Sequence, residues 1–490
     1  MARIAVIGAG MGAMAAAARL AVAGHRVAVH ERSGTFGGAV GAFERDGFAF
    51  DTGPGLLHLP AVYRDLFLKT GKQPLESRIE MAQVEPASHH LFADGTSVSL
   101  PNASRGGVVA ALDSALGAGT GERWGDFLKR ARECWDRSRR PLLEEPLWPN
   151  WQVLGREPYP APRQRRRLRV RQAATLAQVG SWELADRRLG ALLDACALSY
   201  GLDPRRVPAS AALLPYMEHT FGAWYVQGGM RALARAVYER CLERGVEFTF
   251  GSEVTGVLER DGRAVGLELA GGSTVEADEV VAAAGRGGLA GRELWRDGDV
   301  RPGATDPDPG RFTVLLALRG ARATGAAHRT VVHSPDTAAE AAAVFGGGPA
   351  ELPTVTVLRP DDPTTRPDQD HEAVTLTATV SGDPVHWSDK AVRERWADTL
   401  LTAAEQVIPD IGERLLWREV LTPAETGRVR PPALAGEGGA YLRPSNSTRL
   451  AGLHLAGGWS HPGGGLAHAG MSGALVAGLI VEGEDFRGSQ

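Results

Sequence analysis

The chain has 490 residues, 43% of them hydrophobic, and a formal net charge of −4. This length exceeds a single ordinary hydrophobic core, so we expect two or three lobes, and the slight negative charge excludes a general attraction to nucleic acid. No stretch reaches the roughly 18 apolar residues that a membrane-spanning helix needs. Three widely spaced cysteines without a C-x-x-C pair predict a reducing compartment and neither a disulfide framework nor a zinc site; they are Cys134, Cys196 and Cys241.

A nucleotide-binding pattern opens the chain. An apolar run at residues 4–7 predicts a buried parallel strand, and Gly8, Gly10 and Gly12 then allow a tight turn into an alanine-rich helix. The N-terminus of such a helix presents unpaired N–H groups and a positive dipole end, which can bind a pyrophosphate without a lysine. With Met11 and Ala13, the turn matches the G-x-G-x-x-A form of the dinucleotide-binding pattern.

A second predicted strand supplies the acid that this pattern requires. Residues 26–30 are followed by Glu31, 23 residues after Gly8, close to the roughly 20 expected for a carboxylate that accepts from a ribose hydroxyl. Two alternatives are a Gly- and Ala-rich helix that merely packs on a strand, and a secretory signal peptide, which Arg3 and the alanines at 15–18 resemble. The glycine spacing and the strand that follows favour the nucleotide site.

Paired glycines come next. Gly37 and Gly38, and the turn Asp51-Thr-Gly-Pro-Gly55, allow the backbone to pass close to a flat or charged group. The alternative is a set of plain turns between hairpin strands. Together with the first glycine turn and Glu31-Arg32, these segments resemble the N-terminal signature of FAD-dependent amine oxidase and phytoene desaturase-like flavoproteins. The resemblance implies FAD as the cofactor; it departs from the family at Ala39, where an arginine or lysine often follows the glycine pair.

Two later segments extend the resemblance over nearly the whole chain. Residues 225–230, Y-x-x-G-G-M, resemble the second FAD-contacting stretch, with Gln227 where arginine is usual. The glycine-rich run 457–466, with H-P-G-G-G at 461–465, resembles the C-terminal signature of the phytoene desaturase-like enzymes more than that of the amine oxidases. The predicted cofactor-binding residues are Gly8, Gly10, Met11, Gly12, Ala13, Glu31, Arg32, Gly37, Gly38, Gly53, Pro54, Gly55, Val254, Ala284, Gly285, Gly457, Gly458, Gly464, Gly465 and Leu466.

The expected fold class is α/β, a Rossmann-type FAD-binding domain with an inserted α+β substrate domain. Apolar residues at helical spacing between Val108 and Trp135, and again between Leu176 and Leu193, predict helices, while alternating runs after residue 311 predict a sheet. The expected segments are 1–75, 220–292 and 445–490 for the FAD-binding domain, and 76–219 (mostly helical) and 293–444 (sheet-containing) for the substrate domain.

A proline-broken loop with Trp148 and Trp151 precedes a basic run, Arg163 to Arg171. Arginines beside exposed aromatic residues are suited to contact with anionic head groups, so we expect a cytoplasmic protein that could also bind the inner face of a membrane. The alternative is an ordinary solvated face. No nucleic-acid-binding fold accompanies the run, and no metal site is expected.

The family resemblance implies an FAD-dependent oxidoreductase that desaturates a long apolar, carotenoid or isoprenoid, substrate by hydride transfer to the flavin. Candidate catalytic residues are His58, His468 and Tyr225, since a histidine or phenol can move a proton; a polyene could also react without a dedicated base. The alternatives are an amine or porphyrinogen oxidase, of which the near absence of lysine disfavours the amine oxidase, and a non-enzymatic prenyl-protein escort of the same fold.

Overall fold

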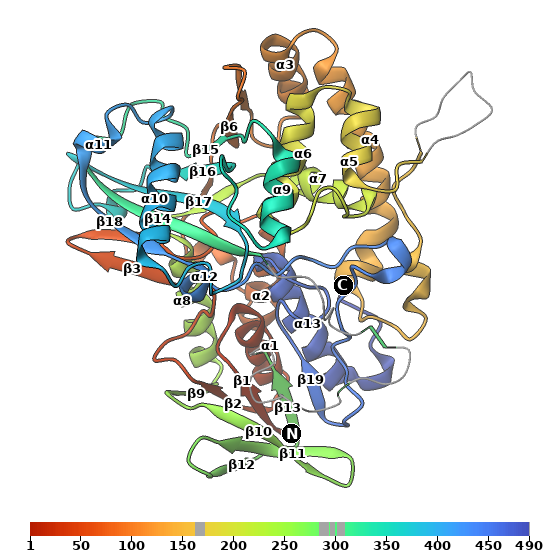
Figure 1. Ribbon diagram of the computed structural model, residues 1–490. Helices are drawn as coiled ribbons and strands as arrows, with labels where there is room; N and C mark the ends of the chain where they lie inside the picture. Colours follow the sequence, from red (N-terminus) through yellow and green to blue (C-terminus); the bar gives the residue numbers. More distant parts are fainter. Residues whose placement is uncertain (162–171, 284–293, 295–298, 301–308, 490) are drawn as a thin grey trace.

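The computed structural model describes residues 1–161, 172–283, 294, 299–300 and 309–489 (Figure 1). A parallel sheet lies at the bottom of Figure 1, a larger sheet at the upper left and a group of helices at the upper right. The arginine run 163–171 and the predicted site residues Ala284 and Gly285 lie outside the described residues.

The parallel sheet has the spatial order β19-β13-β1-β2-β9. Its register aligns Ile7 with His30 on one side and with Ala282 on the other, and Ala282 with Leu455, so the carboxyl ends of four strands lie at one edge. This confirms the strands expected from the apolar runs. The bounds are β1 (Arg3–Ile7), β2 (Arg26–Glu31), β9 (Glu247–Phe250), β13 (Glu279–Ala282) and β19 (Leu453–Leu455).

Helices rich in small residues cover this sheet. Helix α1 packs tightly against α13. The two backbones approach so closely at Gly473 of α13 that a β carbon there would collide with the Gly12 carbonyl oxygen of α1. A small antiparallel sheet, β10-β11-β12, lies beside the parallel one (Figure 1). The bounds are α1 (Met11–Val22), α2 (Ala61–Gly71), α8 (Met230–Glu243), α13 (Leu466–Glu482), β10 (Val254–Arg260), β11 (Arg263–Leu269) and β12 (Thr274–Glu276).

The larger sheet has the spatial order β18-β14-β17-β16-β15-β6-β7. Trp387 and Trp396 pack with the apolar face of β14 and β17 in its core. Two of its strands come from residues 88–100, in the segment expected to be mostly helical. The bounds are β6 (Ser88–Leu91), β7 (Ser97–Leu100), β14 (Gly310–Arg319), β15 (Arg329–Val332), β16 (Val355–Leu358), β17 (His371–Val380) and β18 (Leu415–Leu421).

The helices expected between Val108 and Trp135 are present as two, α3 and α4. Gly117 and Gly119 separate α3 from α4 with φ angles of 106° and 87°, which side chains disfavour. The helices of this lobe and of the large sheet are α3 (Arg105–Leu116), α4 (Thr120–Arg139), α5 (Leu176–Val179), α6 (Arg187–Ser199), α7 (Leu213–Phe221), α9 (Thr337–Gly346), α10 (Lys390–Glu405), α11 (Ile411–Arg414) and α12 (Pro423–Thr426).

Short elements complete the chain. Two short antiparallel pairs, β3–β4 and β5–β8, form separate two-stranded sheets. Their strands are β3 (Ala42–Arg45), β4 (Phe48–Asp51), β5 (Met81–Gln83) and β8 (Trp224–Val226). The single 3₁₀ and π turns are η1 (Leu75–Ser77), η2 (Arg140–Glu144), η3 (Trp151–Gly155), η4 (Gly180–Leu184), η5 (Ala209–Ala212), η6 (Pro363–Thr365), η7 (Glu437–Gly439) and η8 (Gly483–Asp485).

The aromatic loop before the arginine run differs from expectation. Trp148 and Trp151 are half-buried, and the Trp148 indole donates to the Glu145 carboxylate at 3.3 Å. Membrane contact therefore stays a prediction. Within the described ranges, no helix is long and apolar enough to cross a bilayer. All three cysteines are buried and free.

Candidate cofactor and active site

The first and the third of the three glycine-bearing segments, Gly8 to Gly12 and Gly457 to Leu466, meet at the carboxyl edge of the parallel sheet. A β carbon added to Gly12 would stand 2.9 Å from both the Ala469 carbonyl oxygen and the Gly457 Cα. The Ala456 amide donates to the Ala282 carbonyl at 3.0 Å, so the C-terminal loop leaves the sheet beside the first glycine turn. In open α/β sheets, ligands bind at this edge.

The first turn has the form of an anion cradle. Gly8 adopts a φ of 91°, and Gly10 caps α1 in an extended conformation without any side-chain cap. A β carbon added to Gly10 would meet no atom within 4 Å. Packing within the protein therefore does not account for a glycine here, whereas the approach of a phosphate to the helix N-terminus does. The residues present fit the pyrophosphate of a dinucleotide.

The Glu31 carboxylate lies against this turn. One of its oxygens accepts from the Ala9 amide at 2.7 Å and the other from the Ser33 amide at 2.8 Å. An ionised carboxylate has about four lone-pair sites, so two remain for ribose hydroxyls. Arg32, the next residue, is exposed.

The glycine pair at 37–38 lies on the same turn. The Gly37 amide donates to the Ala9 carbonyl at 2.8 Å, and a β carbon on Gly38 would stand 3.0 Å from the Gly10 Cα. Arg231 fixes this loop from α8: its guanidinium lies 4.0 Å from the Phe36 ring centroid and bonds to the carbonyls of Phe36 and Val40. Sequence reasoning missed Arg231.

Asp51 joins the first segment to the second. Its carboxylate accepts from the Met230 amide at 2.8 Å and the Arg231 amide at 3.3 Å, and so caps α8. Burial raises the pKa of Asp51 to about 6, although these bonds oppose the shift. The N-terminus of α8 is therefore occupied by a side chain of the protein, unlike the N-terminus of α1.

Other predicted glycines are explained by close packing within the protein. A β carbon on Gly53 would collide with the Ala39 carbonyl, one on Gly464 with the Arg430 carbonyl, and one on Gly55 would stand 2.7 Å from a Leu358 methyl group. These contacts hold the segments in place. Pro54 lies between two such glycines, and Val254 is buried at the start of β10.

Two polar residues hold the C-terminal loop. The buried Ser472 hydroxyl accepts from the Gly457 amide at 3.0 Å and donates to the His461 carbonyl at 2.9 Å. Asn446, which sequence reasoning missed, donates to the same carbonyl at 2.7 Å. The loop delivers Gly465 to an exposed position at the uncapped N-terminus of α13, beside the half-buried Leu466. A second positive helix end thus faces the edge of the sheet.

The two candidate histidines lie in different surroundings. Burial lowers the pKa of His468, in the first turn of α13, to about 4. His58 also has a lowered pKa through burial, and its Nδ1 lies 3.2 Å from the Gly222 carbonyl. Both are therefore neutral and weak bases near pH 7. His461 of the C-terminal loop bonds to the Glu145 carbonyl at 2.9 Å, as expected of a loop-positioning residue.

Tyr225 is engaged by a buried carboxylate. Its hydroxyl donates to Asp362 at 2.8 Å, and burial together with this bond raises the pKa of the phenol above its ordinary value. Among the described residues, the Asp362 carboxylate accepts five hydrogen bonds, from Tyr225, Gln227, Gly228 and two groups of Thr364. Gln227, the departure from the family pattern, is thus a partner of Asp362, and the geometry gives Tyr225 a positioning role.

A cavity of about 500 Å³ lies between β4, the start of α8 and strands β16 and β17. Gly53, Gly55 and Tyr225 line it, together with four carboxylates and three arginines; these are Glu44, Asp51, Glu80, Glu239, Arg78, Arg231 and Arg235. Its lining is mixed and not a purely apolar tunnel. Among the described residues no cluster suited to a metal ion occurs.

Comparison with known proteins identifies the family to which the chain belongs. Residues 14–481 match the family described as flavin containing amine oxidoreductase. The chain belongs to this family. The protein is therefore an FAD-dependent oxidoreductase, and the resemblance seen in its motifs is confirmed.

Two relatives match nearly the whole length of the chain. A 4,4'-diapolycopene oxygenase from Methylomonas sp is 27% identical to this flavoprotein over 98% of both chains. A phytoene desaturase (neurosporene-forming) from Cereibacter sphaeroides is 29% identical, with 95% of this chain and 92% of that protein covered. Among solved structures, an oxidoreductase from Methanosarcina mazei matches with a TM-score of 0.64 at 16% identity, covering 97% of this chain and 99% of that one, which confirms the fold class.

Proposed function

We propose that this flavoprotein dehydrogenates a long apolar substrate, a carotenoid or related isoprenoid. The observation that carries the proposal is the convergence of the first turn and the H-P-G-G-G loop at one sheet edge, in a chain whose full-length relatives are named for phytoene and diapolycopene. Bound FAD supplies the hydride acceptor for such chemistry.

The chain's own residues would hold and polarise the cofactor. The N-terminus of α1 would bind the pyrophosphate, and Glu31 the ribose hydroxyls. The uncapped N-terminus of α13, at Gly465 and Leu466, would stabilise negative charge that develops on the reduced ring.

The available bases support a substrate that needs little help in losing a proton. His58 and His468 are neutral and have lowered pKa values, and the Tyr225 phenol is tied to Asp362. Oxidation of a polyene can deliver its proton to water, because the positive charge that develops is delocalised. A strong dedicated base is therefore not required of this chain.

Lysine usage disfavours the amine oxidase alternative. The chain has four lysines, Lys69, Lys72, Lys129 and Lys390, and all are exposed. An amine oxidase-type lysine and water arrangement beside the ring has no candidate among them. The mixed lining of the larger cavity does not itself favour either substrate class.

The test is the reduction of the flavin under argon. Purified holoenzyme is mixed separately with phytoene in micelles, with putrescine and with a porphyrinogen, and the flavin absorbance is followed. We expect bleaching by phytoene, and none by a saturated hydrocarbon of the same length in the same micelles. Bleaching by the amine or the porphyrinogen, with none by the polyene, would overturn the proposal.

A further inference from the structure

A second cavity, of about 90 Å³, lies within the substrate part of the molecule. Its walls come from α4, α6, α7 and strands β15 and β16, and from His58, three residues after Gly55. Leu100, Trp124 and Leu192 form apolar wall, but charged and polar side chains also face the space. A cavity of this size accommodates an end group and not the whole of a long ligand.

An ion pair lines this cavity. Arg329 Nη1 of β15 lies 3.2 Å from Glu218 Oε2 of α7, and 16% and 20% of the two side chains remain accessible. Both residues belong to the cavity wall, so their side chains border the space that a ligand would enter.

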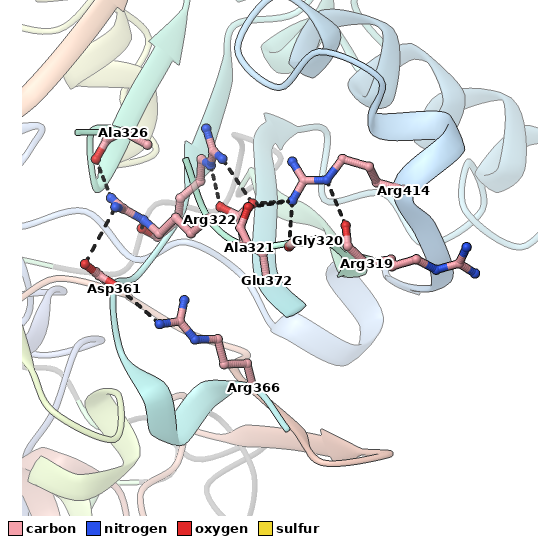
Figure 2. A network of polar contacts seen from close by, with 10 residues as sticks. Arg319, Gly320, Ala321, Arg322, Ala326, Asp361, Arg366, Glu372 and Arg414 are labelled. Atoms are coloured by element: carbon pink, nitrogen blue, oxygen red, sulfur yellow. Dashed lines mark hydrogen bonds and ion pairs between the residues drawn. The ribbon is translucent and has the colours of Figure 1, made fainter. Parts of the chain in front are cut away.

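A fully buried ion pair in the larger sheet differs from the Glu218–Arg329 pair. Arg359 and Glu372 make two parallel contacts, at 2.7 and 3.0 Å, and the side chains are 5% and 0% accessible. Arg414 adds a third contact to Glu372 at 2.9 Å (Figure 2). That pair is saturated and serves to hold strands together. The Glu218–Arg329 pair has a single contact between its members and lies in a cavity wall.

The cavity wall offers both kinds of hydrogen-bonding group. Among the described residues, the guanidinium of Arg329 donates to Glu218 alone, although it carries five N–H groups. His58 Nδ1 faces the Gly222 carbonyl, which can only accept, so Nδ1 carries the ring proton of the neutral imidazole and Nε2 is an acceptor.

The charges of the cavity balance. Glu218 and Arg329 cancel, and burial lowers the pKa values of His58, His90 and His219, so all three rings are neutral. A carboxylate would add an uncompensated negative charge beside Glu218, and an ammonium group a positive charge beside Arg329, and either would be costly in a buried site. A neutral group that both donates and accepts fits best.

We propose that this cavity binds a hydroxyl group at the end of the substrate. Arg329 donates a hydrogen bond to the hydroxyl oxygen, and Glu218 or His58 Nε2 accepts a hydrogen bond from the hydroxyl. The Glu218–Arg329 pair then selects hydroxylated chains over plain hydrocarbons. This inference rests on the proposed function only in taking the rest of the ligand to be an apolar chain.

Binding to the holoenzyme tests the inference without turnover. Farnesol, its methyl ether and the hydrocarbon with hydrogen in place of the hydroxyl are titrated by calorimetry. We expect farnesol to bind about tenfold more tightly than the hydrocarbon, the worth of one hydrogen bond to a charged group. The methyl ether, which cannot donate, should bind between the two. Equal binding of all three by the unaltered protein would overturn the inference.

A double variant provides the second measurement. Removing one member of a buried pair leaves a bare charge, whereas replacing both with apolar residues is often neutral for stability. In Glu218→Leu/Arg329→Met we expect the preference for farnesol to fall to within about twofold. The matched control, Glu394→Leu/Arg418→Met, removes a surface pair between α10 and β18 and should keep the preference. A preference that survives in the first double variant would also overturn the inference.

These outcomes separate the two proposals. If the amine or the porphyrinogen bleaches the flavin and phytoene does not, but the farnesol preference is present and is lost in the double variant, the hydroxyl site stands and the proposed function fails. If phytoene bleaches the flavin and no preference exists, the proposed function stands and the hydroxyl site fails.

Discussion

Gly12 and Gly457 lie so close that a β carbon on Gly12 would stand 2.9 Å from the Gly457 Cα. They are separated by 445 residues, the difference between their positions in the sequence. One opens the helix after the first glycine turn, and the other begins the C-terminal loop. This contact brings the uncapped N-termini of α1 and α13 to the same edge of the sheet.

Gly12→Ala should destabilise the protein and weaken FAD retention together. The added methyl group would press on backbone atoms of Ala469 and Gly457, which cannot rotate away. Overpacking of this kind costs about 1–3 kcal/mol. The melting temperature and the ratio of flavin to protein absorbance after purification measure the two effects.

The control for this change is Gly106→Ala in α3. A β carbon there meets no atom within 4 Å, and alanine is the better helix former. Its melting temperature should equal or exceed that of the unaltered protein. If Gly12→Ala left the melting temperature unchanged, as we expect for Gly106→Ala, the first and third glycine-bearing segments would not approach each other as closely as the structure shows.

Gly10→Ala should weaken FAD binding while the fold persists. The backbone of Gly10, with φ −74° and ψ 169°, suits any residue, and the added β carbon would stand in open space within the protein. The cost to stability should stay below about 1 kcal/mol, the usual scale for a change at a helix cap. Fluorescence titration of FAD into the flavin-free protein should show at least a tenfold weaker affinity, roughly the effect of 1.4 kcal/mol. An unchanged affinity for FAD would show that the pyrophosphate does not bind at this turn.

Tyr225→Phe separates positioning from catalysis. Asp362 would lose one of its five hydrogen bonds, a cost of about 1.5–3 kcal/mol for a bond to a charged group. The melting temperature should therefore fall. Flavin reduction by the substrate should slow by less than about tenfold, because a proton-transferring residue contributes roughly 10²–10⁴-fold. A loss in that larger range would make Tyr225 a catalytic residue after all.

The strands and the first glycine turn could be predicted because their signals are local. Apolar runs such as residues 279–282 identify buried parallel strands, and the spacing of Gly8, Gly10 and Ala13 is set within one turn. The position of the break between α3 and α4 is not set by this spacing, because apolar residues continue at helical spacing on both sides of Gly117 and Gly119.

The residues that assemble the site were missed for a different reason. Arg231 bonds to carbonyls at positions 36 and 40, and Asn446 to the carbonyl of His461. Such side-chain to backbone bonds depend on which segments the fold brings together, and no spacing in the sequence encodes them. Likewise Gly53 and Gly464 match the family pattern, yet the structure shows that they accommodate backbone atoms of Ala39 and Arg430.

Asp51→Asn should change how stability depends on pH. Burial raises the pKa of Asp51 from 3.8 to about 6 in the folded state. The folded protein therefore favours the protonated carboxyl, and the stability that this form provides is fully present below about pH 4 and is lost as the pH rises through 6. Asparagine is neutral throughout and still accepts from the Met230 amide as a helix cap.

The melting temperature of the unaltered protein should therefore fall relative to that of Asp51→Asn between pH 4 and pH 6. Two units of pKa correspond to at most about 3 kcal/mol, since one unit is worth 1.36 kcal/mol. Asp94→Asn serves as the control with the opposite sign. Hydrogen bonds from Thr96 lower the pKa of Asp94, so its contribution is present at neutral pH and is lost as the pH falls. A difference between Asp51→Asn and the unaltered protein that stays constant from pH 4 to 7 would show that the Asp51 carboxylate is ionised throughout, and that its bonds to α8 outweigh its burial.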